Sequence, residues 1–323
     1  MDFSKIFKNS ETYKVLSNDI NTNMLNNCYL LISSDSMKIN NFATFVASSL
    51  LCKEKDFPCF NCEACKKALN GHIDITVLPN EKNITVKDAN FIVEDSVLSP
   101  LEADYKIYIL KDFDNATVQA QNKLLKVFEE GPKNAIFILI CSNEGNVLMT
   151  ILSRCKKIYE QQLSNTELLN IINSEYGSNE RVEEVANISN GNITTAIEYL
   201  TNAKKFEVFK LSVDVLCDMK TSSQVLEYSY RIQKNKEYFT DFLQAMLFNL
   251  SELNLINCGE NLKNQLTYNR FKEVVKDYNF SAINQISKNV IESMKKIQAN
   301  CNIVLVIENL LLKILEVKYL CRK

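Results

Sequence analysis

A change of pattern near residue 160 most constrains how this chain can fold. Up to that point, short apolar segments typical of strands alternate with amphipathic segments typical of helices, whereas the rest reads as successive helices. Strands separated by helices predict a parallel sheet covered on both faces. With 46% hydrophobic residues among 323, the chain can bury two or three cores. We therefore expect an α/β domain followed by all-helical domains.

The predicted elements follow from hydrophobic periodicity. The strands are expected at 28–33, 74–78, 105–110 and 135–140. The helices of the first half are expected at 39–51, 87–98, 117–130 and about 146–153, and those of the second half include 179–188, 194–203, 236–256 and 301–320, with a loop at 218–224. The last helix is apolar over much of its circumference, so it must pack inside a helical domain or against partner subunits.

Four cysteines within 14 residues form the strongest chemical signal. Cys52, Cys59, Cys62 and Cys65 have the spacing C-x6-C-x2-C-x2-C. Two overlapping C-x2-C pairs bring three thiolates together, and a fourth completes the closed tetrahedral shell of structural Zn²⁺. We predict a zinc module over 52–65. His72, the only histidine, could replace one thiolate, but we expect it to serve in a turn.

The compartment and charge of the protein narrow its functions further. No signal peptide or 18-residue apolar run is present, so we expect a cytoplasmic protein without a membrane segment. Thiols stay reduced there, and we interpret Cys28, Cys141, Cys217 and Cys301 as small core residues rather than disulfide partners. The net charge of −2 predicts that direct contact with DNA is weak and salt-sensitive.

The junction after the first strand is where an α/β fold carries a phosphate-binding loop. Compared with G-x-x-x-x-G-K-[ST], it keeps only Lys38. Met37 replaces the second glycine, and Ile39 replaces the hydroxyl residue that holds Mg²⁺. Backbone N–H groups wrap phosphates at angles that a side chain resists. The alternatives are a degenerate nucleotide site, or no such site at all, with Lys38 as a solvated surface lysine.

The strand at 105–110 is followed by Lys111 and Asp112, where a nucleotide site has two acidic residues. A lysine in the metal-binding position repels Mg²⁺. Both ends of the site thus lack the expected residues, and we predict that this chain binds no ATP.

The segment 122–160 carries three further motifs. They are Asn122, Leu124, Leu125, Lys126, Glu129, Glu130 and Pro132 in one helix, then Ser142-Asn143, then Thr150-Ile151-Leu152-Ser153-Arg154-Cys155. The segment resembles the AAA+ clamp-loader subunits of bacterial DNA replication, although Gly131 stands where a proline is usual. Within that family it is most similar to the delta-prime type of the DNA polymerase III clamp loader, which has a four-cysteine zinc module followed by a G-H-P-D turn, here Gly71-His72-Ile73-Asp74.

The resemblance implies a three-part organisation. Residues 1–161 would form an AAA+ α/β domain with the zinc module inserted, 162–204 an all-α lid, and 205–323 an all-α collar domain for oligomerisation. The resemblance is specific over about 5–200 and extends to 205–323 only in length and helical character.

The resemblance also implies a function. Arg154, supported by Ser153 and Cys155, would act in trans as an arginine finger on ATP held by a neighbouring subunit, while Thr194 stands where ATP-binding relatives carry an arginine. The chain would be a non-hydrolysing delta-prime-type subunit in a hetero-pentamer with gamma/tau-type ATPase subunits and a delta subunit. It would help to load the sliding clamp on primer–template DNA, as part of a DNA polymerase holoenzyme.

Other interpretations remain open at this point. The chain could be an active AAA+ clamp-loader ATPase subunit or a zinc-dependent nucleic-acid-binding protein. Taken by itself, Arg154 could be a surface arginine in a local ion pair, and Glu129 and Glu130 read as part of a solvated helix face.

Overall fold

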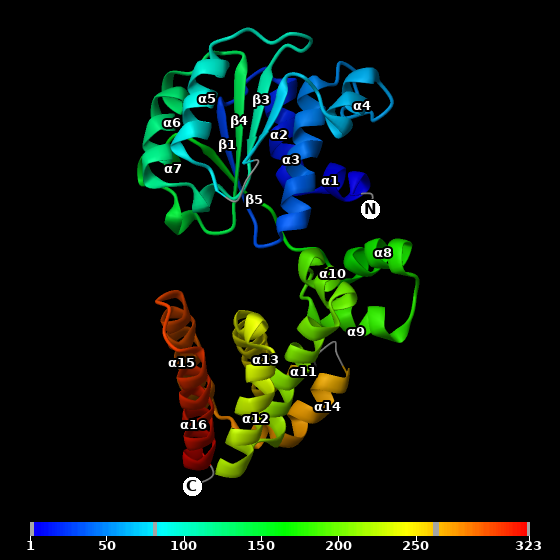
Figure 1. The fold of residues 1–323 in the computed structure, drawn as a ribbon. Helices are drawn as coiled ribbons and strands as arrows, with labels where there is room; N and C mark the ends of the chain where they lie inside the picture. The colour runs from blue at the N-terminus through cyan, green and yellow to red at the C-terminus, as the bar shows by residue number, and fades with distance from the viewer. Residues whose placement is uncertain (1–2, 80–82, 261–264, 322–323) are drawn as a thin grey trace. The chain divides into compact units, whose positions relative to one another are not determined.

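The computed structural model describes residues 3–79, 83–260 and 265–321 and divides into two compact units (Figure 1). Unit 1 consists of Met1–Ser178 and Ser189–Thr195, and unit 2 consists of Asn179–Ile188 and Ala196–Lys323. The predicted lid is thus shared between the two units. The division of the chain at residues 161 and 204 stays a prediction.

Unit 1 is built on a parallel five-stranded sheet in the order β2-β3-β4-β1-β5. The strands are β1 (Cys28–Ile32), β2 (Ile75–Leu78), β3 (Lys106–Leu110), β4 (Ala135–Cys141) and β5 (Lys156–Tyr159). The first four confirm the predicted strands to within one residue at either end. β5 was not predicted, because its sequence KKIY has no apolar run and it lies at an edge of the sheet. Since all strands are parallel, the segments that follow β1, β3 and β4 lie along one edge.

Helices cover both faces of this sheet, as predicted (Figure 1). The helices of unit 1 are α1 (Ser4–Asn9), α2 (Glu11–Asn21), α3 (Ser36–Leu51), α4 (Glu63–Asn70), α5 (Val86–Ser96), α6 (Val118–Glu130), α7 (Met149–Leu152) and α8 (Asn165–Tyr176), with 3₁₀ turns η1 (Phe113–Asn115) and η2 (Glu144–Asn146). Alternate strand residues such as Leu30, Tyr108 and Phe137 pack with residues of α5 and α6 into one apolar core. This core fixes α6 and the segments after β3 and β4.

At the end of α6, the backbone leaves no room for a side chain at Gly131, the position where a proline is usual. A Cβ atom at Gly131 would lie only 2.1 Å from the carbonyl oxygen of Val127. No side chain fits this backbone, and the chain leaves the helix through Gly131 and Pro132 into β4.

Unit 2 is entirely helical over its described residues. It contains α9 (Glu180–Ile188), α11 (Ala203–Asp218), α12 (Ser222–Lys234), α13 (Phe239–Asn257), α14 (Gln265–Val274), α15 (Phe280–Gln298) and α16 (Ile303–Cys321), with 3₁₀ turns η3 (Lys236–Tyr238) and η4 (Val275–Asp277). α10 (Ile193–Thr201) begins in unit 1 and ends in unit 2. The loop predicted at 218–224 is shorter, because Thr221 caps α12.

The C-terminal helix α16 has two kinds of surface. Leu310, Leu311 and Ile314 are buried within the unit, where α16 packs on α12 and α15. Lys318 is also buried, and its ammonium group donates to the Leu216 and Met219 carbonyl oxygens at 2.8 Å each. Five apolar side chains of α16 remain exposed, namely Val304, Leu305, Leu312, Tyr319 and Leu320. Within the described ranges, no helix is both long enough and apolar enough to cross a bilayer.

Candidate functional site

Lys38 lies at the start of α3, but its side chain is not available to a phosphate. Its ammonium nitrogen is 2.9 Å from Glu160 Oε1 and also donates to the carbonyl oxygen of Gln161. The two side chains are only 3% and 1% exposed, so this is a buried ion pair rather than the solvated surface lysine considered above. The positive charge that would attract a triphosphate is neutralised inside the chain.

The N-terminal end of α3 is engaged in the same way. Asp35 caps the helix by accepting from the backbone N–H of Lys38 at 3.1 Å. Thr194 Oγ1 accepts from the N–H of Met37 at 2.9 Å and donates to Asp35 Oδ1 at 2.7 Å, while Asp35 Oδ2 accepts from the N–H of Ile193 at 2.6 Å. The N–H groups of a first helical turn are the usual anchors of phosphate. Here the chain itself supplies their acceptors.

Lys38→Met should lower the free energy of unfolding of unit 1 by about 3–5 kcal/mol, because it leaves the Glu160 carboxylate buried without its partner. Chemical denaturation followed by circular dichroism measures this change. The matched control is Lys14→Met, since Lys14 pairs with Glu11 on the exposed surface. The double variant Lys38→Met, Glu160→Gln should regain most of the loss. Equal stabilities of wild type and Lys38→Met would contradict the buried pair.

In the segment after β3, the acidic side chain of Asp114 has a structural role. Lys111 and Asp112 follow the strand, and Asp112 adopts a left-handed backbone with φ of 48°. The buried residue is Asp114, which sequence reasoning missed. It accepts from the backbone N–H and hydroxyl of Ser142 at 3.2 and 2.8 Å and from the N–H of Asn143 at 3.0 Å. Asp114 therefore ties η1 to the turn after β4.

Gln121 is a second residue that sequence reasoning missed. Its side chain is 1% exposed and points from α6 toward the approach to α7. Nε2 donates to the carbonyl oxygen of Asn146 at 3.1 Å, and Oε1 accepts from the N–H of Leu148 at 2.9 Å. A buried glutamine in an amphipathic helix is the signal that could have identified it. Gln121 fixes the start of the segment that carries Arg154.

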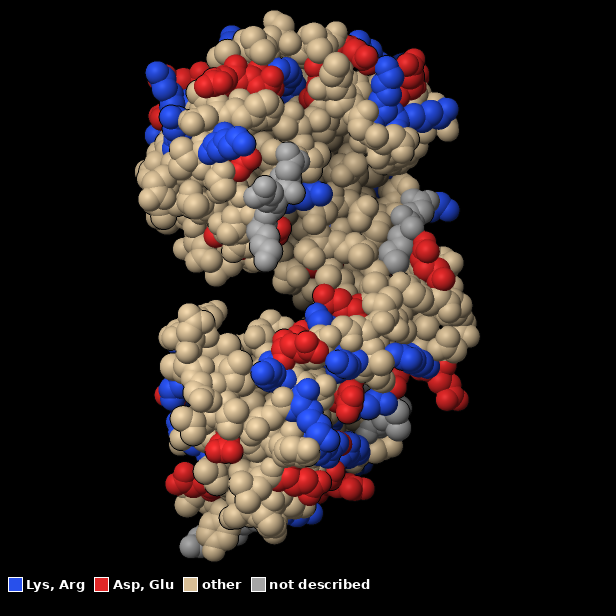
Figure 2. All heavy atoms as spheres, in the orientation of Figure 1, with Lys and Arg blue, Asp and Glu red and all other residues tan. Residues whose placement is uncertain are grey.

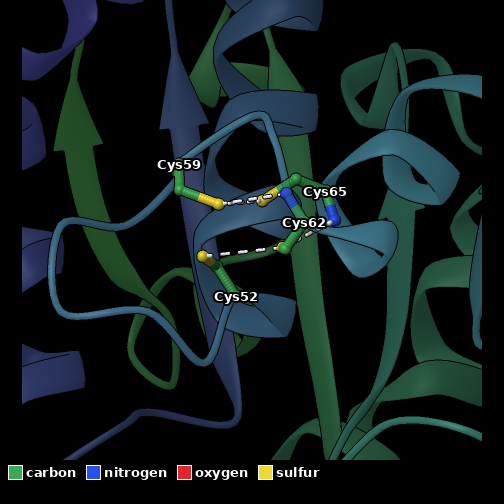
Figure 3. A group of neighbouring side chains, drawn as sticks. All are labelled: Cys52, Cys59, Cys62 and Cys65. Carbon is green, nitrogen blue, oxygen red and sulfur yellow. Dashed lines mark hydrogen bonds between the residues drawn. The ribbon is translucent and has the colours of Figure 1, made fainter.

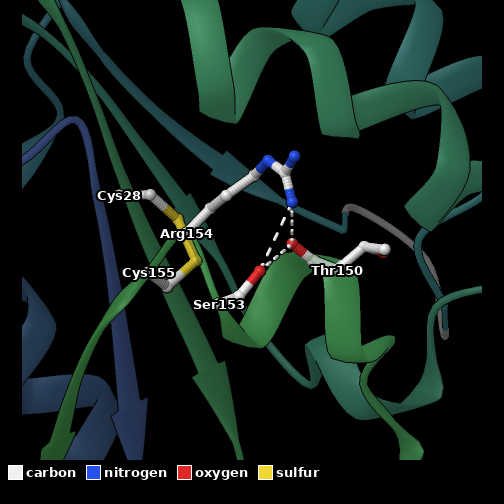
Figure 4. The surroundings of a disulfide bond; sticks show 5 residues. All are labelled: Cys28, Thr150, Ser153, Arg154 and Cys155. Carbon is white, nitrogen blue, oxygen red and sulfur yellow. Dashed lines mark hydrogen bonds between the residues drawn. A yellow bond between two sulfur atoms is a disulfide. The ribbon is translucent and has the colours of Figure 1, made fainter.

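Arg154 lies beyond the end of α7, which is shorter than the predicted helix. α7 covers only Met149–Leu152, and the Arg154 N–H donates to the Ile151 carbonyl oxygen at 3.0 Å. The guanidinium points toward Thr150 and Ser153 and away from Cys28 and Cys155 (Figure 4). Nη1 donates to the Thr150 carbonyl oxygen at 2.8 Å and to Ser153 Oγ at 3.3 Å. The side chain is 31% exposed, so its tip reaches the surface.

Glu129 is exposed, as expected for a solvated helix face, and it is also the counter-ion of Arg154. Nη2 of Arg154 lies 2.8 Å from Glu129 Oε1. This hydrogen bond lowers the pKa of Glu129 and raises the pKa of Arg154. The pair joins the C-terminal end of α6 to the turn after α7. The local ion pair and the surface position of Arg154 therefore coexist in the isolated chain.

Cys155 is bonded to Cys28, which corrects the expectation that Cys28 is not a disulfide partner. The two sulfur atoms are bonded and the Cα atoms are 4.7 Å apart. The reason is the sheet register: Tyr29 of β1 is opposite Lys156 of β5, so the residues immediately before them are neighbours. Cys28, Cys141 and Cys217 do lie in the core, as expected, whereas Cys301 is exposed, which contradicts its interpretation as a core residue.

The four clustered cysteines converge on one point (Figure 3). Their sulfur atoms all lie within 4.8 Å of one another, and the pairs Cys59–Cys65 and Cys52–Cys62 are each separated by 4.0 Å. Four thiolates around a zinc ion with Zn–S bonds of about 2.3 Å require separations of roughly 3.8 Å, so the cluster fits the ion closely. The group could hold Zn²⁺.

Backbone geometry supports the thiolate state of Cys59, whereas burial raises the pKa of Cys52 and of Cys65. The N–H of Cys62 donates to Cys59 Sγ at 3.3 Å, and this bond is the main cause that lowers the pKa of Cys59 to about 6. The N–H of Cys65 donates to Cys62 Sγ at 3.4 Å at the start of α4. Zinc ligands must be deprotonated, so these N–H donors favour metal binding.

His72 lies outside the four-cysteine group and serves in a turn. Its Nδ1 accepts from the N–H of Asp74 at 3.1 Å. The Asp74 carboxylate in turn accepts from the N–H groups of Leu101, Glu102 and Ala103 at 2.7 to 2.9 Å. The turn anchors the loop before β3 and leaves all four metal positions to cysteine.

The charged surface shows no basic stripe on the face drawn in Figure 2, where Lys and Arg alternate with Asp and Glu. Several surface lysines on the chain have acidic partners. Lys67 pairs with Glu102, and Lys157 pairs with Glu144, at 2.7 and 2.8 Å. This agrees with the near balance of 37 basic and 39 acidic residues in the sequence.

Comparison with known proteins finds subunits of DNA polymerase III. The family model described as "DNA polymerase III, delta subunit" matches residues 8–164. The delta' subunit of DNA polymerase III from Bacillus subtilis is 26% identical over 316 residues, which cover 94% of this chain and 95% of the relative. The gamma/tau subunit of Mycoplasma genitalium is 25% identical over 257 residues. That match covers 76% of this chain, which spans only 41% of the relative's length.

Solved structures with similar folds include a DNA polymerase III gamma subunit-related protein from Thermotoga maritima. Its TM-score is 0.46 at 19% identity, over 94% of this chain and 99% of that one. The Holliday junction branch migration motor RuvB of Thermotoga maritima has a TM-score of 0.42 at 15% identity, over 78% of this chain and 75% of that one.

The parallel sheet with helices on both faces, followed by an all-helical region, is the architecture expected of an AAA+ protein. The chain is similar to the clamp-loader subunits of DNA polymerase III, as its matches to delta' and gamma/tau relatives indicate.

Proposed function

We propose that this chain is a delta-prime-type clamp-loader subunit that binds no ATP and supplies Arg154 to the ATP of a neighbouring subunit. The observation that carries the proposal is the engagement of Lys38 and the first turn of α3 by Glu160, Asp35 and Thr194. A triphosphate would have to displace a buried ion pair and a set of short hydrogen bonds that the chain makes by itself.

The position of Arg154 supports the second half of the proposal. The residue is partly exposed on a short turn that Gln121 fixes to α6 and that Cys155 joins to β1. A planar guanidinium presented rigidly at a surface suits the oxygens of a transferring phosphoryl group. Gln121 and Cys155, which hold Arg154 in place, are both buried. In the same chain, the position expected for ATP is occupied by the ion pair of Lys38 with Glu160.

The second candidate is an active ATPase subunit of the gamma/tau type. Matches to gamma/tau relatives favour it, because they cover up to 76% of this chain. Met37, Ile39 and Thr194 argue against it, since they replace the glycine, the Mg²⁺-binding hydroxyl and the arginine that the ATP-binding members carry.

The partners follow from the same proposal. The relatives are named as subunits of DNA polymerase III, so we infer a complex with gamma/tau-type and delta subunits that loads the sliding clamp on primed DNA in the cytoplasm. The exposed Leu305, Leu312 and Tyr319 on α16 support a collar role, because partner subunits could cover them. We also propose that the four-cysteine group holds a structural zinc ion.

Calorimetric titration of the purified chain with Mg²⁺-ATP tests the proposal. We expect no measurable heat of binding at concentrations that saturate a gamma/tau-type subunit measured alongside as the control. A dissociation constant in the micromolar range would favour the ATPase candidate and contradict the internally bonded site.

A further inference from the structure

The donors of the Arg154 guanidinium are largely used by the chain itself. Arginine has five N–H groups. Nη1 donates to Thr150 and Ser153, and Nη2 donates to Glu129. Nε is buried and has no hydrogen-bond partner among the described residues. A phosphate oxygen that approaches from the surface therefore meets a guanidinium that is already bonded on both of its outer nitrogens.

The three acceptors are not equivalent. Thr150 and Ser153 belong to the same turn as Arg154 and move with it. Glu129 comes from a different element, α6, and its side chain is 51% exposed. A phosphate oxygen forms the same kind of charge-assisted hydrogen bond as a carboxylate oxygen. Glu129 is therefore the one acceptor that a triphosphate can replace without changing the turn.

We propose that Glu129 is a positioning residue that competes with the neighbouring triphosphate for Arg154. With the neighbouring site empty, the carboxylate holds the guanidinium beside α6. When ATP is bound there, a phosphate oxygen takes the place of Oε1, and the carboxylate charge opposes this exchange. The inference rests on the proposed trans role of Arg154.

The competition has a distinctive kinetic consequence. It weakens the contact of Arg154 with bound ATP and with the transition state to the same extent, so it raises KM and leaves kcat nearly unchanged. If Glu129 merely stabilised the turn, its loss would misplace Arg154 and would lower kcat instead of lowering KM.

The test is steady-state ATPase of the assembled clamp loader with sliding clamp and primed DNA. Glu129→Gln should lower the apparent KM for ATP about two- to fivefold, the factor that an exposed ion pair provides. The kcat should stay within about twofold of wild type. Glu130→Gln is the matched control, since Glu130 is the next residue of α6 and is exposed. It should change neither constant.

The combined variant Arg154→Ala, Glu129→Gln distinguishes the competition by Glu129 from the trans role of Arg154. Its KM should equal that of Arg154→Ala, because Glu129 acts only through Arg154. If Arg154→Ala lowers kcat but Glu129→Gln leaves KM unchanged or raises it, the competition is overturned and the trans role stands. If Arg154→Ala leaves kcat and KM unchanged, both are overturned.

Discussion

Arg154→Ala should lower ATP hydrolysis by about 10³-fold at the one ATP site that this residue is proposed to complete, the lower end of the contribution of arginine fingers. The stimulated hydrolysis rate of the whole loader should fall only by the fraction that this one site contributes, because the other ATP sites keep their own arginine residues. Folding should be unaffected, since the side chain is partly exposed and its ion pair with Glu129 of α6 lies at the surface. Single-turnover hydrolysis with clamp and primed DNA measures the effect directly.

Lys157→Ala is the matched control for this variant. Lys157 lies three residues further on, is 33% exposed, and also makes an ion pair of 2.8 Å. Its removal should leave the rate within about twofold of wild type if it does not contact ATP. Arg154→Lys should recover little, because an ammonium lacks the planar fork of the guanidinium. Full hydrolysis by Arg154→Ala would exclude Arg154 from the reaction.

Cys62→Ser should reduce the zinc content from about one ion per chain to nearly none, because a closed structural site needs all four ligands. Loss of the ion should lower the thermal midpoint of the α/β unit by more than roughly 5 °C. The largest loss of amide protection from hydrogen exchange should fall in the segment between α3 and α4, which has little apolar core. Metal analysis, calorimetry and hydrogen exchange measure these three effects.

Cys258→Ser provides the control for the metal experiment, since Cys258 is exposed and lies outside the cluster. It should keep wild-type zinc content and stability. A chelator should reproduce the effects of Cys62→Ser on the wild-type protein and leave Cys62→Ser unchanged. Purification without chelator that yields protein with no zinc would rule out the ligand assignment.

The features best predicted from the sequence are those encoded within short segments. The apolar runs of β1, β3 and β4 indicate buried strands, and the four cysteines lie close enough in the chain to indicate one metal site. β5 was not predicted because it begins with two lysines and because it is recognisable as a strand only through its pairing with β1. The length of α7 depends on the turn η2 and on its contact with Gln121.

The features that could not be predicted depend on long-range contacts. Lys38 meets Glu160 only because β1 and β5 are neighbours in the sheet. The same pairing brings Cys28 to Cys155, a partner 127 residues away. Glu129 appears solvated in a helical pattern, but the end of α6 lies beside the turn of Arg154. That the chain binds no ATP stays a prediction from the sequence, whereas the contacts of Lys38 with Glu160 and of Asp35 with Thr194 required the structure.

A structure of the assembled loader with a non-hydrolysable ATP analogue tests the central claim most directly. We predict a guanidinium nitrogen of Arg154 within hydrogen-bonding distance of the γ-phosphate in the adjoining subunit, and Lys38 still paired with Glu160 with no nucleotide beside it. Nucleotide density on Lys38, or Arg154 directed away from every subunit boundary, would contradict the account.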